Sequence, residues 1–497
     1  MTKGQHALSR RHDTDAAVHP PAFPLRNAAR APARIAFTLA LAMTLLSKTA
    51  AADYAPVHLP AHETHVLDNG MRVVIAPRHD LPLASVELLV ETGAAEDPPG
   101  KAGLASFTAG LLRRGTQSRS ADEIDGAIEF VGGRLDTGAG ADATSISAGV
   151  TSENLPLAID LVADVALHPS FPEGEFRIHK KRVIAFLAQA LDDPGTVADR
   201  AMLGALLPPE HPYANPSSGT RKSVSTFQLA QVRKFHAARY APSKATLFVV
   251  GDVEPEAVMR LAKKHFGAWK TRAAEAPAIP AAQAPRRNRI LIVHKAEATQ
   301  AQVRFVGAAF TRKTDPAYFP TVVANGAFGG GFTSRLVDEI RVNRGLSYSV
   351  GSRLVQLRGA GFYTFSSFTR NETIGELLRV ALAESQRART EGFSPEEIAR
   401  SKSYLAGLYP LRLETNDQIA SALAEAHLYA LPEDWVETYR QNLAAPDPAQ
   451  VDAAAKEWFF AQPFAIVLVG DEKAIRKGLK EADVQGDVRV VPIEQME

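Results

Sequence analysis

The chain has 497 residues, of which 45% are hydrophobic and 22% charged, and this balance excludes a fibrous or largely disordered protein. A formal net charge of +1 gives no overall basic character for binding nucleic acid. Because there is no cysteine, disulfides, thiolate metal sites and a cysteine nucleophile are excluded, and a metal would need His, Asp or Glu ligands.

The first 52 residues have the pattern of an export signal. Arg26, Arg30 and Arg34 precede an apolar run from Ile35 to Leu46, and small residues follow it. This order is typical of a secretory signal peptide, and the run is too short to span a bilayer. We therefore predict a protein exported to the periplasm, with cleavage near residue 52 and no membrane association of the mature chain.

Residues 53–271 are predicted to form a first domain that mixes strands and helices. The turn Asp68-Asn69-Gly70 joins two strands of a tight hairpin, because Asn-Gly accepts the positive φ angles that such a turn needs. A further strand is predicted over 84–91. The stretch GKAGLASFTAGLLRRGT, residues 100–116, is predicted to be a short amphipathic helix that packs through Leu104, Phe107, Leu111 and Leu112.

The next helix is predicted to begin at Ser120, which can cap it, with apolar positions at Ile124, Ile128 and Phe130. Gly132-Gly133 ends this helix. Two strands are expected within 132–150. The remaining predicted elements of the first domain are helices over 155–167, 175–191 and 197–207 and a strand over 244–250.

Residues 272–286 (RAAEAPAIPAAQAPR) have the composition of a linker and leave a second domain at 287–497. The two domains have matching landmarks. Asp97-Pro98 corresponds to Asp315-Pro316, and the FVVGD and VLVGD sequences recur at nearly the same offset, which indicates a tandem repeat of one fold. We predict an α+β protein of two homologous domains, each an antiparallel sheet with helices packed on one face.

Two sequence patterns that are often functional are weak here. His58, His62 and His65 cluster near the start of the mature chain, but the two His of HETH, His62 and His65, are three apart in a strand-like pattern, whereas a helical zinc site needs two His four apart. The glycines at 329–331 precede a helix, but no Lys-Ser/Thr follows as a phosphate loop requires. We interpret these residues as an exposed segment and a structural turn.

From the LDNG turn onward the sequence resembles the pitrilysin/insulinase family of zinc peptidases, whose smaller members have two homologous domains. The resemblance covers nearly all of the chain after residue 52. It is carried by LDNGMRVVIAP, GLASFTAGLLRRGT and HPYANPSSGT in the first half, and by GGGFTSRLVDEIRVNRGLSYSV and SPEEIARSKSYLAGLY in the second. Each motif is weak alone, but their order and spacing are specific.

The resemblance places a zinc site where this chain has no ligands. In catalytic members the helix within 100–116 reads H-x-x-E-H, in which two His bind zinc, the Glu activates water, and a later helix supplies a third ligand. Here the two His positions hold Ser106 and Gly110, the base position holds Ala109, and the third ligand position holds Phe186. The resemblance therefore implies that this chain holds no zinc and has no peptidase activity alone.

The second half keeps the residues that family members bring to the substrate from their C-terminal domain, an Arg and a Tyr seven residues later. In EIRVNRGLSY these are Arg341 and Tyr348. Arg341 is expected late in a helix over 333–344 that ends at Gly345, before a strand starting at Leu346. The guanidinium can donate to peptide carbonyls, and the Tyr hydroxyl can donate to the oxyanion formed when water attacks. The spacing alone is equally compatible with a surface Arg and a core Tyr.

The sequence thus favours a non-catalytic subunit of a heterodimeric zinc metallopeptidase. A zinc-bearing homologous subunit would be its partner, and an unfolded peptide would be the substrate enclosed between them. Residues 132–150 correspond to the family's edge-strand region, where a peptide adds to the sheet. Two alternatives stay open, namely a structural or peptide-binding scaffold with no role in catalysis, and a self-sufficient peptidase with a relocated metal.

Overall fold

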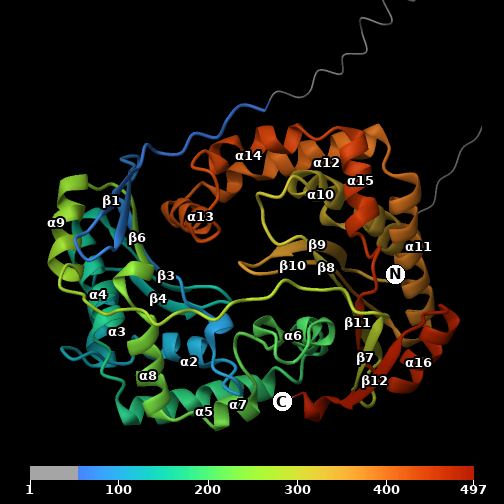
Figure 1. Ribbon diagram of the computed structural model, residues 1–497, viewed down its shortest axis with the longest axis horizontal. Coiled ribbons are helices and arrows are strands. Elements are labelled where there is room, and N and C mark those ends of the chain that lie inside the picture. The colour runs from blue at the N-terminus through green and yellow to red at the C-terminus, as the bar shows by residue number, and fades with distance from the viewer. Residues whose placement is uncertain (1–53, 497) are drawn as a thin grey trace, which may run out of the picture. The chain divides into compact units, whose positions relative to one another are not determined.

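Two six-stranded sheets organise the part of the chain that the structure describes, residues 54–496 of a computed structural model (Figure 1). The predicted signal peptide lies outside the described residues. The first sheet has the strand order β1-β2-β6-β3-β5-β4 and the second β12-β7-β11-β8-β10-β9. The strands of the first sheet are β1 (Glu63–Val66), β2 (Arg72–Pro77), β3 (Leu83–Val90), β4 (Arg134–Ala139), β5 (Thr144–Thr151) and β6 (Ala245–Gly251). Those of the second are β7 (Arg289–His294), β8 (Gln300–Ala309), β9 (Val350–Gln356), β10 (Gly361–Arg370), β11 (Ala465–Gly470) and β12 (Asp487–Pro492).

Five strands of each sheet repeat the same pairing scheme, and the sixth, β1 or β12, differs in direction. Neighbouring strands are antiparallel except β2 with β6 in the first sheet, and β7 with β11 and with β12 in the second. The helices of the first half are α2 (Leu104–Leu111), α3 (Ala121–Phe130), α4 (Leu155–Leu167), α5 (Glu173–Gln189), α6 (Pro194–Leu206), α7 (Arg221–Ser225), α8 (Leu229–Arg239) and α9 (Pro255–Phe266). Those of the second half are α10 (Tyr318–Asn325), α11 (Ile374–Glu391), α12 (Pro395–Leu408), α13 (Asn416–Leu428), α14 (Trp435–Ala444), α15 (Pro448–Trp458) and α16 (Glu472–Glu481). This architecture confirms the predicted α+β class.

Each sheet packs its own half's helices on one face. Successive side chains of a strand point to opposite faces, and β2 separates them clearly. Val73 and Ile75 join the core built with the helices of the first half, whereas Val74 and Ala76 belong to a separate cluster on the other face. Both faces of β2 are therefore buried, which explains why its sequence VVIA is apolar throughout.

The second face of each sheet is covered by a helix from the other half (Figure 1). Helix α13 packs on β3 and β6 of the first sheet, where Ile419 and Leu423 meet Val74 and Phe248. Helix α6 packs on β8 and β11 of the second sheet, where Val197 and its neighbours meet apolar residues of β7 and β11. The helix predicted over 197–207 corresponds to α6, whereas α13 and this exchange were not predicted, because periodicity shows that a face is apolar and not which sheet covers it.

Polar contacts fix the two exchanged helices. On α13, the Asp417 carboxylate accepts a hydrogen bond of 2.6 Å from the Ser85 hydroxyl and forms an ion pair with Arg134 on the edge strand β4. On α6, the Asp199 carboxylate accepts a hydrogen bond of 2.6 Å from Arg304 on β8. Each helix thus carries one acidic side chain that anchors it to strands of the opposite half.

Most local predictions for the first half agree with the structure. The prediction of Phe130 as an apolar position of its helix's packed face does not. Gly70 has φ +86° in the hairpin turn, and Ser120 caps α3 through a reciprocal pair of hydrogen bonds with Glu123. Ile124 and Ile128 are buried as predicted. Phe130, however, is 91% exposed, because it is the last residue of α3 and falls off the buried face.

The stretch 272–286 contains no helix or strand, and it lies against the first half. A ring nitrogen of His211 is 2.9 Å from the Pro280 carbonyl, and Arg239 donates to the Glu275 carbonyl at 2.9 Å. Within residues 54–496, none of the helices combines the length and apolar character needed to cross a bilayer.

Candidate functional site

Helix α2 is held by a capped N-terminus and a buried apolar face. Gly103, at φ +90°, precedes it, and a β-carbon there would lie 2.6 Å from the Gly219 backbone, so only glycine fits. The Asp97 carboxylate accepts hydrogen bonds from the backbone N–H groups of Gly103 at 2.7 Å and Ala105 at 2.8 Å. Burial raises the pKa of Asp97 to about 7, while these N–H donors oppose that rise. Four apolar side chains, Leu104, Phe107, Leu111 and Leu112, are buried as predicted.

The four positions that would carry a zinc site offer no metal chemistry. Ser106 lines a cavity of about 520 Å³, Ala109 is fully buried, and Gly110 has no side chain. Phe186 lies on α5 and is 64% exposed. None of these side chains is a zinc ligand or a general base, so the residues present do not fit a catalytic zinc ion. Within residues 54–496 no group of three or more His, Asp or Glu side chains has an arrangement that could hold a metal ion.

The imidazole of His179 on α5 fills the space above Gly110. A β-carbon built on Gly110 would lie 2.7 Å from Cε1 and 2.9 Å from Nε2 of this ring. The ring also packs against Phe107, with 4.7 Å between ring centroids. Burial, followed by the charges of Arg114 and Arg182, lowers the pKa of His179 to about 4, so the ring is neutral near pH 7.

The sequence analysis did not single out His179. It lies seven residues before Phe186, which is two turns of α-helix, so both residues belong to the same side of α5. That spacing is visible in the sequence. The contact with Gly110 is not, because it depends on how α2 and α5 pack together.

The cavity beside Ser106 lies next to the edge of the first sheet. Ala139, the last residue of β4, lines it together with Thr196, Asp199 and Arg200 of the exchanged helix α6. Arg200 is held by hydrogen bonds to the Ser218 hydroxyl at 2.6 Å and the Gly219 carbonyl at 2.5 Å. Strand β4 forms the outer edge of its sheet.

Arg341 and Tyr348, predicted as a functional pair, lie together in the second half. The Arg341 guanidinium carbon is 4.6 Å from the centroid of the Tyr348 ring and 5.2 Å from that of Phe332, so the cation lies between two aromatic rings. Tyr348 is 76% exposed and Phe332 67% exposed. Within residues 54–496 neither the guanidinium nor the Tyr348 hydroxyl has a hydrogen-bond or ion-pair partner.

The backbone that presents this pair is unusual. The π-helices η5 (Gly326–Gly330) and η6 (Val337–Asn343) occupy this segment, and such helices are rare and frequent at functional sites. The predicted helix over 333–344 is therefore wound largely as a π-helix. Gly345, at φ +58°, ends it as predicted, but the next strand begins at Val350 and not at Leu346.

Models of one peptidase family match both halves of the chain. Residues 72–204 match the family described as Insulinase (Peptidase family M16), and residues 226–405 match the Peptidase M16 inactive domain. An uncharacterized zinc protease of Mycobacterium tuberculosis is 30% identical over 423 residues, which cover 84% of this chain and 94% of that protein. The chain belongs to the M16 peptidase family.

Solved structures of M16 proteins agree with this assignment. The peptidase M16 inactive domain from Pseudomonas fluorescens superposes with a TM-score of 0.76 at 25% identity, covering 82% of this chain and 98% of that one. A protease from Helicobacter pylori shares the fold, with a TM-score of 0.75 at 21% identity over 83% of this chain and 100% of that one. The M16 chain described here is an inactive peptidase-like subunit.

Proposed function

We propose that this M16 chain is the non-catalytic subunit of a heterodimeric zinc metallopeptidase. It contributes Arg341 and Tyr348 to the site of a zinc-bearing homologous subunit and encloses an unfolded peptide with it. The observation that carries the proposal is the geometry of the pair. The half-buried Arg341 cation stacks on the exposed Tyr348 ring, and neither side chain has a hydrogen-bond or ion-pair partner among residues 54–496.

The chemistry of the pair suits a shared site. Within that complex the zinc ion of the partner subunit would activate water. The Arg341 guanidinium has donors for the carbonyl oxygens of a bound peptide, and the Tyr348 hydroxyl can donate to the developing oxyanion. Stacking on Phe332 and Tyr348 restricts the long Arg side chain, which lowers the entropy lost when it binds.

The exposed apolar residues around the pair support a contact with another chain. Phe332, Val342 and Tyr348 are all more than 60% exposed and lie within one short segment. Exposed apolar groups of this kind mark interaction sites when they gather in a patch. The cavity beside Ser106 and the free edge of β4 provide further surface on which a peptide chain can lie.

The test is to mix the purified chain with its zinc-bearing M16 homologue from the same organism and measure peptide cleavage. We expect neither protein alone to reach the rate of the mixture. Tyr348→Phe, which removes only the hydroxyl, should lower kcat by about 10²-fold, as loss of one oxyanion donor does. Tyr404→Phe, at an exposed tyrosine of α12, is the matched control. An unchanged rate with Tyr348→Phe contradicts a shared site.

The cavity beside Ser106 favours a second candidate, a peptide-binding scaffold with no role in catalysis. This alternative predicts peptide binding without cleavage in any mixture. Size-exclusion chromatography with light scattering, with and without the zinc-bearing homologue, separates the two, because only the first proposal requires a stable or peptide-induced heterodimer. Zinc analysis of the pure chain tests the third possibility, a relocated metal.

The proposed location is the periplasm, on the basis of the signal-like residues 1–52. Fractionation of cells, followed by N-terminal sequencing of the mature protein, tests it. Recovery of the uncleaved chain in the cytoplasm contradicts it.

A further inference from the structure

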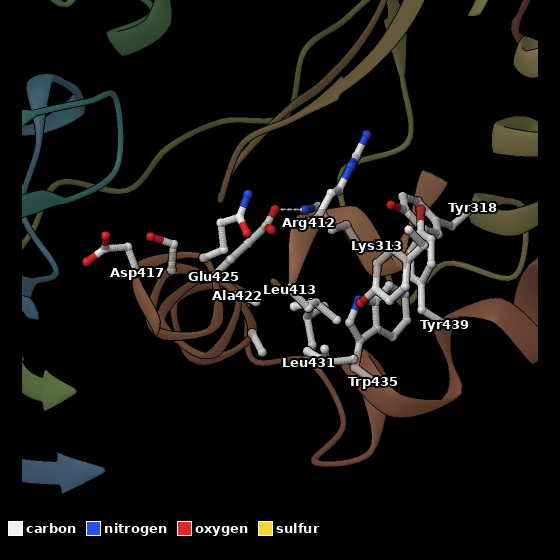
Figure 2. A pocket seen from close by; sticks show the side chains of 15 residues that line it. Lys313, Tyr318, Arg412, Leu413, Asp417, Ala422, Glu425, Leu431, Trp435 and Tyr439 are labelled. Atoms are coloured by element: carbon white, nitrogen blue, oxygen red, sulfur yellow. Dashed lines mark hydrogen bonds and ion pairs between the residues drawn. The ribbon is translucent and has the colours of Figure 1, made fainter. Parts of the chain in front are cut away.

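A separate cavity of about 440 Å³ lies among the helices of the second half (Figure 2). One side is the exchanged helix α13, through residues such as Ala422 and Glu425. The other side is an aromatic wall, in which the rings of Tyr409 and Tyr439 stack at 4.2 Å and those of Tyr318 and Trp435 lie 5.5 Å apart. Figure 2 shows the α13 coil, marked by Asp417 and Ala422, on one side of the space, and the rings of Tyr318, Trp435 and Tyr439 on the other.

The charges at this cavity leave one cation uncompensated. Lys313 forms an ion pair with Glu425 and lies 5.0 Å from the Tyr429 ring centroid, so its charge is balanced. Arg412, in the short helix η8 (Pro410–Arg412), is exposed at the rim, and its guanidinium has no ion-pair or hydrogen-bond partner in the part of the chain that the structure describes. Figure 2 shows its side chain extending away from the labelled rings.

The phenols of the wall are hydrogen-bond donors. Burial raises the pKa of Tyr318, Tyr409 and Tyr439, so all three stay protonated, and the nearby charge of Arg412 opposes this rise for each of them. Arg412 is thus electrostatically close to three neutral hydroxyls. The Tyr318 and Tyr439 hydroxyls hydrogen-bond to each other, so the donors available to a carboxylate are the Arg412 guanidinium and the Tyr409 hydroxyl, and the flat rings are a surface for an aromatic or apolar body.

We infer that this cavity binds an organic carboxylate with an aromatic or apolar body of about amino-acid to dipeptide size. Arg412 would bind the carboxylate at the rim, and the wall formed by Tyr318, Tyr409, Trp435 and Tyr439 would pack against the body. The cavity volume lies within the range of small-molecule sites. Both a free acylated amino acid and the C-terminal residue of a peptide have this chemistry.

This site is independent of the proposed partnership, because its residues are distinct from Arg341 and Tyr348. Binding of a ligand in this cavity would nevertheless affect the first half of the chain. Helix α13 forms one wall of the cavity, and its Asp417 is bonded to Ser85 and Arg134 of the first sheet. A ligand that fills the cavity would therefore brace the exchanged helix.

Calorimetric titration of the full chain with N-acetylphenylalanine and with its amide tests the inference. We expect saturable binding of the acid, and binding of the amide weaker by about ten- to a hundredfold, the value of a charge-assisted hydrogen bond. Arg412→Gln should weaken binding of the acid by a similar factor, and Arg379→Gln, at an exposed arginine of α11, should not. Ala422→Phe, which fills the cavity from α13, should abolish binding while Arg412 is intact.

Thermal unfolding of each variant shows whether the fold is kept. Because Arg412 is exposed, its replacement should not lower the stability of the protein.

A hexapeptide ending in phenylalanine, with a free or amidated C-terminus, distinguishes a peptide from a small carboxylate as the source of the ligand. Tighter binding of the free-acid hexapeptide than of N-acetylphenylalanine identifies a peptide C-terminus as the ligand, whereas weaker binding identifies a small carboxylate. Absence of saturable binding, equal affinity for acid and amide, or unchanged affinity in Arg412→Gln overturns the inference.

Discussion

The segment around α2 in the first half and the segment around Arg341 in the second half belong to sheets with one topology and have opposite chemical character. In the first, Ala109 is buried and His179 occupies the space above Gly110. In the second, the half-buried Arg341 stacks on the exposed Tyr348, and neither side chain has a hydrogen-bond or ion-pair partner among residues 54–496. The difference shows that the space above Gly110 is filled by a side chain of the same half, whereas the Tyr348 side chain is open to solvent.

The largest expected effect is on the exposed pair. In a mixture with the zinc-bearing homologue, Arg341→Met should lower kcat/KM by about 10²-fold, since it removes the donors to the peptide carbonyls. Arg341→Lys should retain only part of the original kcat/KM, because the point charge of an ammonium group lacks the planar donor geometry of guanidinium. Arg379→Gln is the control for removal of an exposed arginine. Equal rates of peptide cleavage for Arg341→Met and the unchanged chain would show that Arg341 contributes nothing to catalysis in the mixture.

The exchange of helices joins the two halves, and its disruption should have the next largest effect. Ile419 of α13 is 3% exposed and packs on the first sheet. Ile419→Ala should lower the free energy of unfolding by about 2–4 kcal/mol, through lost burial and the cavity that remains. Leu411→Ala, at a half-exposed position of η8, should change it by less than about 0.5 kcal/mol. Denaturant unfolding followed by circular dichroism measures both, and similar values for the two variants would show that α13 is not an essential part of the core.

Local chemistry predicted most elements of the first half and few of the second. The Asn69-Gly70 turn, the Ser120 cap and the Gly345 terminus all depend on residues adjacent in sequence, and the structure has each of them. The exchange of α6 and α13 depends instead on contacts between residues far apart in sequence, from 105 positions for Asp199 and Arg304 to 332 for Ser85 and Asp417. The periodicity of the apolar residues in a helix does not indicate which of two similar sheets the helix will cover. The exchange therefore could not be predicted from the sequence.

The candidate functional site also has some features that could be predicted from the sequence and others that could not. The resemblance to the pitrilysin/insulinase family, and not the spacing alone, pointed to Arg341 and Tyr348 as a pair, and the structure places the two side chains in contact. The winding of the Arg341 segment as a π-helix was not predicted, because an inserted residue leaves the apolar period nearly unchanged. His179 was missed because its importance comes from the missing side chain of Gly110 on another helix.

The neutral His179 should make stability depend on pH. Its pKa is about 4 in the folded protein and 6.5 as a reference for the unfolded chain, so between these values the unfolded chain binds more protons. The free energy of unfolding should therefore fall as pH decreases from about 6.5 to 4, by up to about 2–3 kcal/mol from this residue. His179→Phe should lack this part of the slope. Subtracting the two unfolding curves cancels other titrating groups, and identical slopes would show that His179 is as solvated as a surface histidine.

The smallest expected effect tests directly whether the first half's site has been filled. In Gly110→Ala the new methyl group meets the His179 ring at 2.7 Å, and the ring is itself packed on Phe107. Because the ring is the end of a side chain it can shift, so the variant should lose only about 1 kcal/mol of unfolding free energy. In the background of His179→Ala the same change should cost nothing or stabilise α2, since alanine favours a helix over glycine. A double-mutant cycle measures this coupling. Coupling near zero would mean that the space above Gly110 is open, and that restoring ligands at Ser106, Gly110 and Phe186 would meet no steric barrier from His179.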